Sequence, residues 1–242
     1  MPWRLSLILL CLLPALACAD LSARRLQDIR LQAFGLCSNL LAFYNPNQQA
    51  ADPRYAERYR QDLLTLRGLL AGQGAASLEL AVAVAEMGKQ IDGLEAVPAG
   101  QDELYPGWII PLLKAHARLD REAAEAYAAS PPGDERLLTL HRLSLDIERL
   151  LLLYQTRAFS MLGMYVMVVD DDTVPQLDAG ILQGFADLTV QWPEHSAELE
   201  ALKHNYDFIR PRLLQHSRNW VPGSAAYYLG RITSRLAQFD TE

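Results

Sequence analysis

The sequence predicts an all-α protein, an elongated antiparallel bundle of seven to eight helices. Apolar residues recur at helical spacing through almost the whole chain, and no stretch alternates apolar and polar residues with the period of two that marks a strand. Breaks that contain proline or glycine divide the chain into segments of ordinary helix length. Short connections between such segments favour antiparallel neighbours.

A repeated order of predicted elements indicates how these helices could be grouped. A helix, a polar loop, a second helix, a short break and a third helix occur over 26–95 and again over 145–214. Two interpretations stay open: two similar helical units, or a common helical pattern alone. With two units, the division falls between 20–129 and 130–242.

The breaks place the helices along the chain. We expect them over 20–44, 53–71, 78–94, 106–129, 134–169, 174–192, from 194 onward, and over 222–239. Pro211 lies inside the seventh of these, and a proline in a helix interior removes a hydrogen bond and clashes with the preceding turn. We therefore expect Pro211 to kink or end that helix.

The helix predicted over 134–169 is the longest, because it contains no proline and a single glycine, Gly163. Asp134 suits its N-cap, and Glu135 suits the positive end of the helix dipole. Its apolar residues cover a wide arc, and beyond Ala158 nearly every side is apolar. Other helices should therefore surround its second half.

The N-terminal residues are typical of a secretory signal peptide, which we assign to 1–19. A short basic start with Arg4 precedes an apolar run and the small residues after Pro14. The helical domain then covers 20–242 and is expected in the periplasm. Cys18 supports an alternative, a lipoprotein anchored to the membrane through that residue.

Charge and cysteine content exclude several classes of protein. The formal net charge is −7, and loss of Arg4 with a signal peptide would make it −8, which disfavours nucleic acid and anionic membranes as partners. Cys37 is the one thiol left in the expected mature chain if Cys18 is removed or modified, so an internal disulfide framework is excluded. An unknown envelope protein or a small ligand, which could be anionic, is the expected partner, with a homodimer as one alternative.

A polar column within the longest predicted helix marks candidate ligand-binding residues. His141, Glu148 and Gln155 are spaced seven apart and fall inside the apolar arc. A polar stripe on an inward face needs partners or water. The three residues either line a pocket or metal site, or reach solvent because this half of the helix is only partly covered.

A metal site is the alternative chemistry. His116 and Asp120 lie four apart, on one helix face, and His141 with Glu148 adds further ligand types. The chain lacks the Glu-x-x-His arrangement of di-metal bundles, and it lacks the motifs for haem, phosphate loops and serine hydrolases. We therefore expect no cofactor and no catalytic centre, with a periplasmic metal-binding protein or metal-dependent enzyme that uses these four residues as the alternative.

Arg157 is the most informative single charge. Apolar residues precede and follow it, so we expect it inside the bundle, where an arginine needs a carboxylate, a carbonyl or a bound anion. The segment from Arg157 to Leu162, Arg-Ala-Phe-Ser-Met-Leu, resembles the Arg-Met-Leu-Ser-Gln pattern of one sensor family. That family comprises the extracytoplasmic helical modules of type IV pilus chemotaxis transducers and nitrate/nitrite-sensing histidine kinases.

The resemblance extends over about 135–240. A helix break, a helix over 177–190, Trp192, another helix and a final helix after Val221 follow the motif in similar order. The resemblance implies a sensor module whose motif residues, Arg157 and Ser160, face the interior and hold an anion. The resulting expectation is an exported, non-enzymatic protein, sensor-like or adaptor in role, that binds a small ligand or an envelope partner.

Overall fold

The computed structural model describes residues 3–47, 51–71, 78–159, 162–165, 170–215 and 220–240. These residues form eight α-helices and no strand, which confirms the predicted all-α bundle. The helices are α1 (Trp3–Phe43), α2 (Pro53–Leu70), α3 (Leu78–Glu95), α4 (Tyr105–Ala129), α5 (Glu135–Thr156), α6 (Thr173–Gln191), α7 (Ser196–Leu214) and α8 (Pro222–Phe239). Short 3-10 helices η2 (Asp102–Leu104), η3 (Leu162–Tyr165) and η4 (Pro193–His195) lie in the connections.

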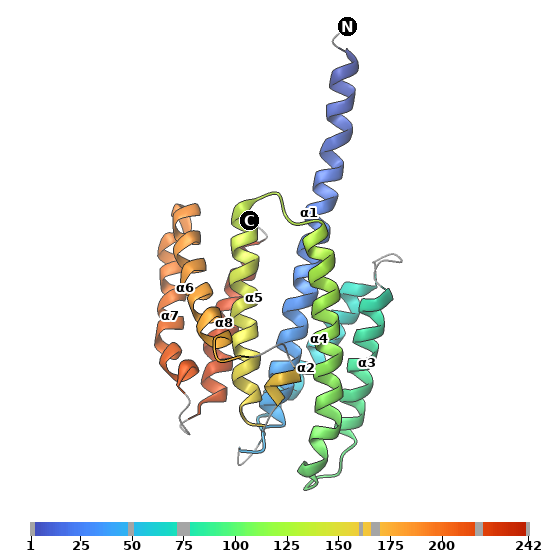
Figure 1. Ribbon diagram of the computed structural model, residues 1–242, viewed down its shortest axis with the longest axis vertical. Coiled ribbons are helices and arrows are strands. Elements are labelled where there is room, and N and C mark those ends of the chain that lie inside the picture. Colours follow the sequence, from blue (N-terminus) through green and yellow to red (C-terminus); the bar gives the residue numbers. More distant parts are fainter. Residues whose placement is uncertain are drawn as a thin grey trace.

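The eight helices form two four-helix rings that lie side by side (Figure 1). In the first ring, α1 to α4, each helix contacts the next and α4 closes onto α1. The second ring, α5 to α8, repeats that order, with α8 closing onto α5. The rings meet along a seam where α1 contacts α5 and α8. The same order of neighbours in both rings is what two similar helical units predict.

Helix α1 is longer than its counterpart α5, and its N-terminal part projects beyond the other helices (Figure 1). The helix begins at Trp3, so the segment expected to be a signal peptide is continuous with the first helix of the bundle. No helix in the described part of the chain combines the length and apolar character needed to cross a membrane.

The apolar arc of α5 is wide because this helix contributes to the cores of both rings. Leu145, Leu152 and Leu153 pack into the core of the first ring. Leu143 and Ile147 pack into the core of the second ring, on the other side of the helix. In all, 15 of the 22 residues of α5 are buried.

The prediction of one continuous helix from Asp134 to Val169 is wrong at its C-terminal end. Asp134 is the N-cap, and its carboxylate accepts a hydrogen bond from the backbone N–H of Arg136 at 2.8 Å. The helix ends at Thr156, where the chain turns and continues as η3 against α4. Phe159 and Leu162 are buried in the core of the first ring. Their apolar character therefore reflects packing of a turn, and not a continued helix.

Pro211 does not end the helix at its own position. It lies inside α7, which continues for three residues beyond it and ends at Leu214. The missing N–H of a proline leaves one carbonyl unpaired in the preceding turn, which a helix tolerates more easily close to its end.

Gly184 sets how closely α5 and α6 approach. A Cβ added at this position would lie 3.1 Å from Cβ and 3.3 Å from Cδ1 of Leu143. Gly184→Val should therefore lower the free energy of unfolding by about 2 kcal/mol, because the added methyl groups must displace a packed leucine. Urea denaturation measures this loss, with Gly68→Ala as the matched control.

Gly68 lies in α2 with open space around its Cα. Alanine there should stabilise the protein by roughly 0.5 kcal/mol through helix propensity. A Gly184→Val variant as stable as the wild type would contradict the close approach of α5 and α6.

Candidate ligand-binding site

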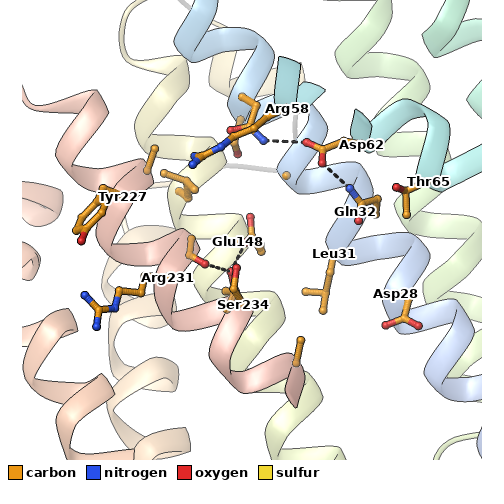
Figure 2. Close-up of a pocket in the computed structure, with 18 of the residues that line it drawn as sticks. Asp28, Leu31, Gln32, Arg58, Asp62, Thr65, Glu148, Tyr227, Arg231 and Ser234 are labelled. Atoms are coloured by element: carbon orange, nitrogen blue, oxygen red, sulfur yellow. Dashed lines mark hydrogen bonds between the residues drawn. The ribbon is translucent and has the colours of Figure 1, made fainter. Parts of the chain in front are cut away.

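A cavity of about 650 Å³ lies between the two rings (Figure 2). Helices α1 and α2 line it from the first ring, and α5 and α8 line it from the second. This volume is in the range of pockets that hold small organic ligands. Its polar and charged lining residues are Asp28, Gln32, Ser38, Asn39, Arg58, Asp62, Thr65, Glu148, Tyr227, Arg231, Thr233 and Ser234.

The helical repeat explains how the cavity forms. Along α1 the lining residues follow one another at intervals of one or three positions, from Asp28 to Asn39, which places them on one stripe. Along α8 the stripe contains the small residues Ala226, Gly230 and Ala237. Polar groups on one helix and small residues on the other leave the space between them unfilled, whereas the remaining faces of both helices pack into the cores.

Asp62 is held on the α2 side of the cavity by two amide donors from α1 (Figure 2). Gln32 Nε2 donates to Oδ1 at 2.6 Å, and Asn39 Nδ2 donates to Oδ2 at 2.8 Å. Burial raises the pKa of Asp62 to about 6, although both amide donors and the charge of Arg58 act in the opposite direction. Asp62 is therefore ionised above about pH 6, with both carboxylate oxygens fixed in place.

Glu148 lies on the α5 wall of the same cavity and is 7 % exposed. Thr233 Oγ1 donates to Oε1 at 2.8 Å, whereas Oε2 is buried without a hydrogen-bond partner in the described part of the chain. Burial raises the pKa of Glu148 to about 7, with a smaller contribution in the same direction from the charge of Asp62 and an opposing one from the Thr233 hydrogen bond. Ser38 Oγ, also on the cavity wall, is the second buried polar atom without a partner.

Two arginines lie at the mouth of the cavity. Arg58 of α2 and Arg231 of α8 are both exposed, and neither lies within ion-pair distance of a carboxylate among the described residues. In the view of Figure 2, their guanidinium groups lie toward Tyr227, and the carboxylates of Asp62 and Asp28 lie on the opposite side. The cavity wall thus contains both positive and negative side chains, with Arg58 one helical turn from Asp62 on α2 and Arg231 on α8.

The structure separates the three members of the predicted polar column. His141, Glu148 and Gln155 are all buried, so the expectation that this column reaches solvent is wrong. The reason is that α5 lies between the rings and is covered along its length. Glu148 lines the cavity between the rings, whereas His141 and Gln155 do not.

His141 lines a second cavity of about 480 Å³, formed by residues of α1, α4, α5 and α6. Its Nδ1 lies 2.9 Å from Tyr127 Oη, and its Nε2 lies 3.3 Å from Asp240 Oδ1. Gln155 Nε2 donates to the carbonyl of Pro222 at 3.1 Å and so holds the start of α8. Both side chains therefore have structural partners.

The residues of the alternative metal site do not come together. His116 is fully buried in the first ring, with its ring edge against Phe34 at a centroid distance of 4.4 Å. Asp120 pairs with Arg30 at 2.6 Å. Within the described residues, no group of three or more His, Cys, Asp or Glu side chains could hold a metal ion.

Arg157 is exposed, so the prediction that it lies inside the bundle is wrong. Its Nη1 donates to the carbonyl of Gln215 at 3.2 Å, and its guanidinium carbon lies 5.0 Å from the ring centre of Tyr154. The placement changes because the helix, predicted to continue to Val169, ends at Thr156, one residue before Arg157. Ser160 lies outside the described residues, as does the side chain of Cys18.

Comparison with protein-family models, curated proteins and solved structures finds no match to this chain. The candidate site therefore rests on its own geometry. Sequence reasoning found Glu148 but missed Asp62, Gln32, Asn39 and the two arginines. The available signal was the run of polar residues on one stripe of α1, between columns that are otherwise apolar.

Proposed function

We propose that the protein is an exported, non-enzymatic helical-bundle protein that acts as a sensor-like or adaptor component. Its ligand is a small molecule bound in the cavity between the two rings. The observation that carries this proposal is that Glu148 Oε2 and Ser38 Oγ are buried in the cavity wall without partners. Buried polar groups are nearly always hydrogen-bonded, so a ligand or ordered water satisfies them.

The position of the cavity supports a sensor-like role. A ligand there contacts α1 and α2 of one ring and α5 and α8 of the other at the same time. Its affinity then depends on how the rings are placed relative to each other. By linkage, such a ligand favours one arrangement of the rings, which a partner protein in the cell envelope can detect.

Native mass spectrometry tests ligand binding. Protein purified from its own cell extract without denaturation should carry a non-covalent small molecule, released on unfolding. Glu148→Gln should reduce its occupancy, because the substitution removes the unpaired carboxylate oxygen in the cavity wall. Glu200→Gln is the matched control, since Glu200 is exposed on α7 and outside the cavity. Equal occupancy in wild type and Glu148→Gln would contradict the proposal.

Mass analysis of the N-terminus tests export. Cells that express the full chain should yield protein that begins after Ala17 or Ala19. A diacylglyceryl group on Cys18 would replace the periplasmic assignment with a membrane-anchored one. Recovery of the protein with its first residues intact, in the cytoplasmic fraction, would refute export.

A further inference from the structure

Three acidic side chains line the cavity, Asp28, Asp62 and Glu148, and none of them has a positive side chain within ion-pair distance among the described residues. Asp62 and Glu148 line the same cavity, and the charge of Asp62 contributes to the raised pKa of Glu148. Two carboxylates in one poorly solvated space disfavour each other's ionisation, and a cation placed between them removes that cost. The unpaired Oε2 of Glu148 adds an acceptor without a donor. A ligand group with several N–H donors and a positive charge satisfies both carboxylates.

These side chains suit an organic cation better than a metal ion. Within the described residues, no cluster of three or more ligand side chains is close enough for a metal. Each carboxylate oxygen of Asp62 already accepts one amide hydrogen bond. Each oxygen therefore keeps one lone pair for a further hydrogen bond, but the carboxylate is not an open coordination site for a metal. An ammonium group suits this arrangement because its three donors bond to oxygens that already carry other bonds.

At the mouth of the cavity, two arginines need a negatively charged ligand group. Arg58 and Arg231 come from helices of different rings and have no acidic partner in the described part of the chain. Guanidinium groups bind carboxylates with two parallel hydrogen bonds, which makes arginine suited to recognising that group. The same two charges repel a ligand that is positive at both ends, whereas Asp62 and Glu148 repel a ligand that is negative at both ends.

We propose, on the basis of the proposed ligand-binding function, that the cavity takes a zwitterion. Its ammonium group lies against Glu148 and Asp62, and its carboxylate lies between Arg58 and Arg231. The lining of α1 extends over eleven residue steps, from Asp28 to Asn39, or roughly 16 Å along the helix axis. The cavity therefore has room for charges separated by several bonds, as in a long amino acid or a short peptide.

Three matched series of probes test the charge pattern. They are the linear amino carboxylates 4-aminobutanoate, 6-aminohexanoate and 8-aminooctanoate, with the diamines and the dicarboxylates of the same lengths. Isothermal titration calorimetry should show binding of at least one amino carboxylate. The diamine and the dicarboxylate of that length should each bind about tenfold more weakly or worse, since each places one charge beside a like charge. Equal or tighter binding of either matched probe would overturn the zwitterion assignment.

Substitutions at the two ends should alter selectivity in opposite directions. Glu148→Gln should weaken the amino carboxylate about tenfold and reduce discrimination against the dicarboxylate. Arg231→Gln should reduce discrimination against the diamine instead. A purely structural role would lower the affinity for all probes together. Glu200→Gln and Arg121→Gln, both exposed and outside the cavity, should leave all three series unchanged.

The outcomes separate this inference from the proposed function. If no amino carboxylate binds but a co-purified molecule does, and its occupancy falls in Glu148→Gln, the zwitterion assignment is wrong and the ligand-binding function stands. If no probe binds and the occupancy of no co-purified molecule depends on Glu148, the zwitterion assignment and the ligand-binding function are both wrong. Amino carboxylate binding that is insensitive to Glu148→Gln and Arg231→Gln would place the ligand elsewhere and overturn the assignment.

Discussion

His116→Leu is expected to stabilise the protein, and the gain should grow as the solution becomes more acidic. The imidazole is fully buried in α4, and neither ring nitrogen has a hydrogen-bond partner in the described part of the chain. Leaving a buried polar group unsatisfied costs about 1–3 kcal/mol. Leucine has a similar volume and no polar atom, so part of that cost should be recovered at neutral pH.

The pH dependence follows from burial. Burial lowers the pKa of His116 from 6.5 to about 4, and the positive charges of Arg149 and Arg30 also lower it, against the opposing effect of Asp120. Between these two pH values the unfolded chain binds the proton and the folded chain does not. The wild type therefore loses stability as pH falls from about 6.5 to 4, by up to about 3 kcal/mol. The leucine variant lacks this loss.

Urea denaturation at pH 7 and pH 4 measures both effects. The difference between His116→Leu and wild type should be larger at pH 4 than at pH 7. His204→Leu is the matched control, because His204 is exposed on α7 and should show no such growth of the difference. A difference of the same size at both pH values would mean that the buried imidazole is protonated in the folded protein.

Glu148→Gln should have the opposite pH signature. Burial raises the pKa of Glu148 from 4.5 to about 7, so between these values the folded chain binds the proton and the unfolded chain does not. The wild type is thus less stable above pH 7 than below pH 4.5, by up to about 3 kcal/mol. Glutamine carries no charge at any of these pH values, and it keeps an oxygen to accept from Thr233.

The expected result is a variant that matches the wild type near pH 4.5 and is more stable at pH 8, measured by denaturation in the absence of ligand. Glu200→Gln, at an exposed position, should show no such trend. Together with the loss of binding proposed above, a stability gain at pH 8 would mark Glu148 as retained for function, at the expense of stability. A destabilised variant at pH 8 would show that the ionised carboxylate is well satisfied.

The fold could be predicted because its signals are local. Helical spacing of apolar residues, together with breaks such as those at Pro53 and Pro222, predicts all eight helices and places most of their ends close to the observed positions, apart from the start of α1 and the end of α5. The end of α5 could not be placed in this way. Phe159 and Leu162 are apolar because they pack under the first ring as a turn, and an apolar run reports burial without reporting backbone conformation.

The site could be predicted only in part, for a related reason. Glu148 stands out because a carboxylate on an apolar face is unusual. Asp62 and Gln32 look like ordinary polar residues of α2 and α1, and only the approach of the two rings brings them to one cavity. The prediction for Arg157 depends on a continuing helix, and it is wrong because α5 ends at Thr156.

The ring arrangement also has a consequence for synthesis of the chain. All helices of the first ring have been made when Ala129 leaves the ribosome, so this ring can form early from contacts that are close in sequence. The stripe of α1 that later lines the cavity then faces water, which its polar residues, such as Gln32, Ser38 and Asn39, tolerate. The cavity itself is complete only when α8, the last helix made, docks on the seam. A ligand bound in the cavity therefore stabilises only the complete chain. A nascent chain that stops short of α8 should form helices but should not have the binding site.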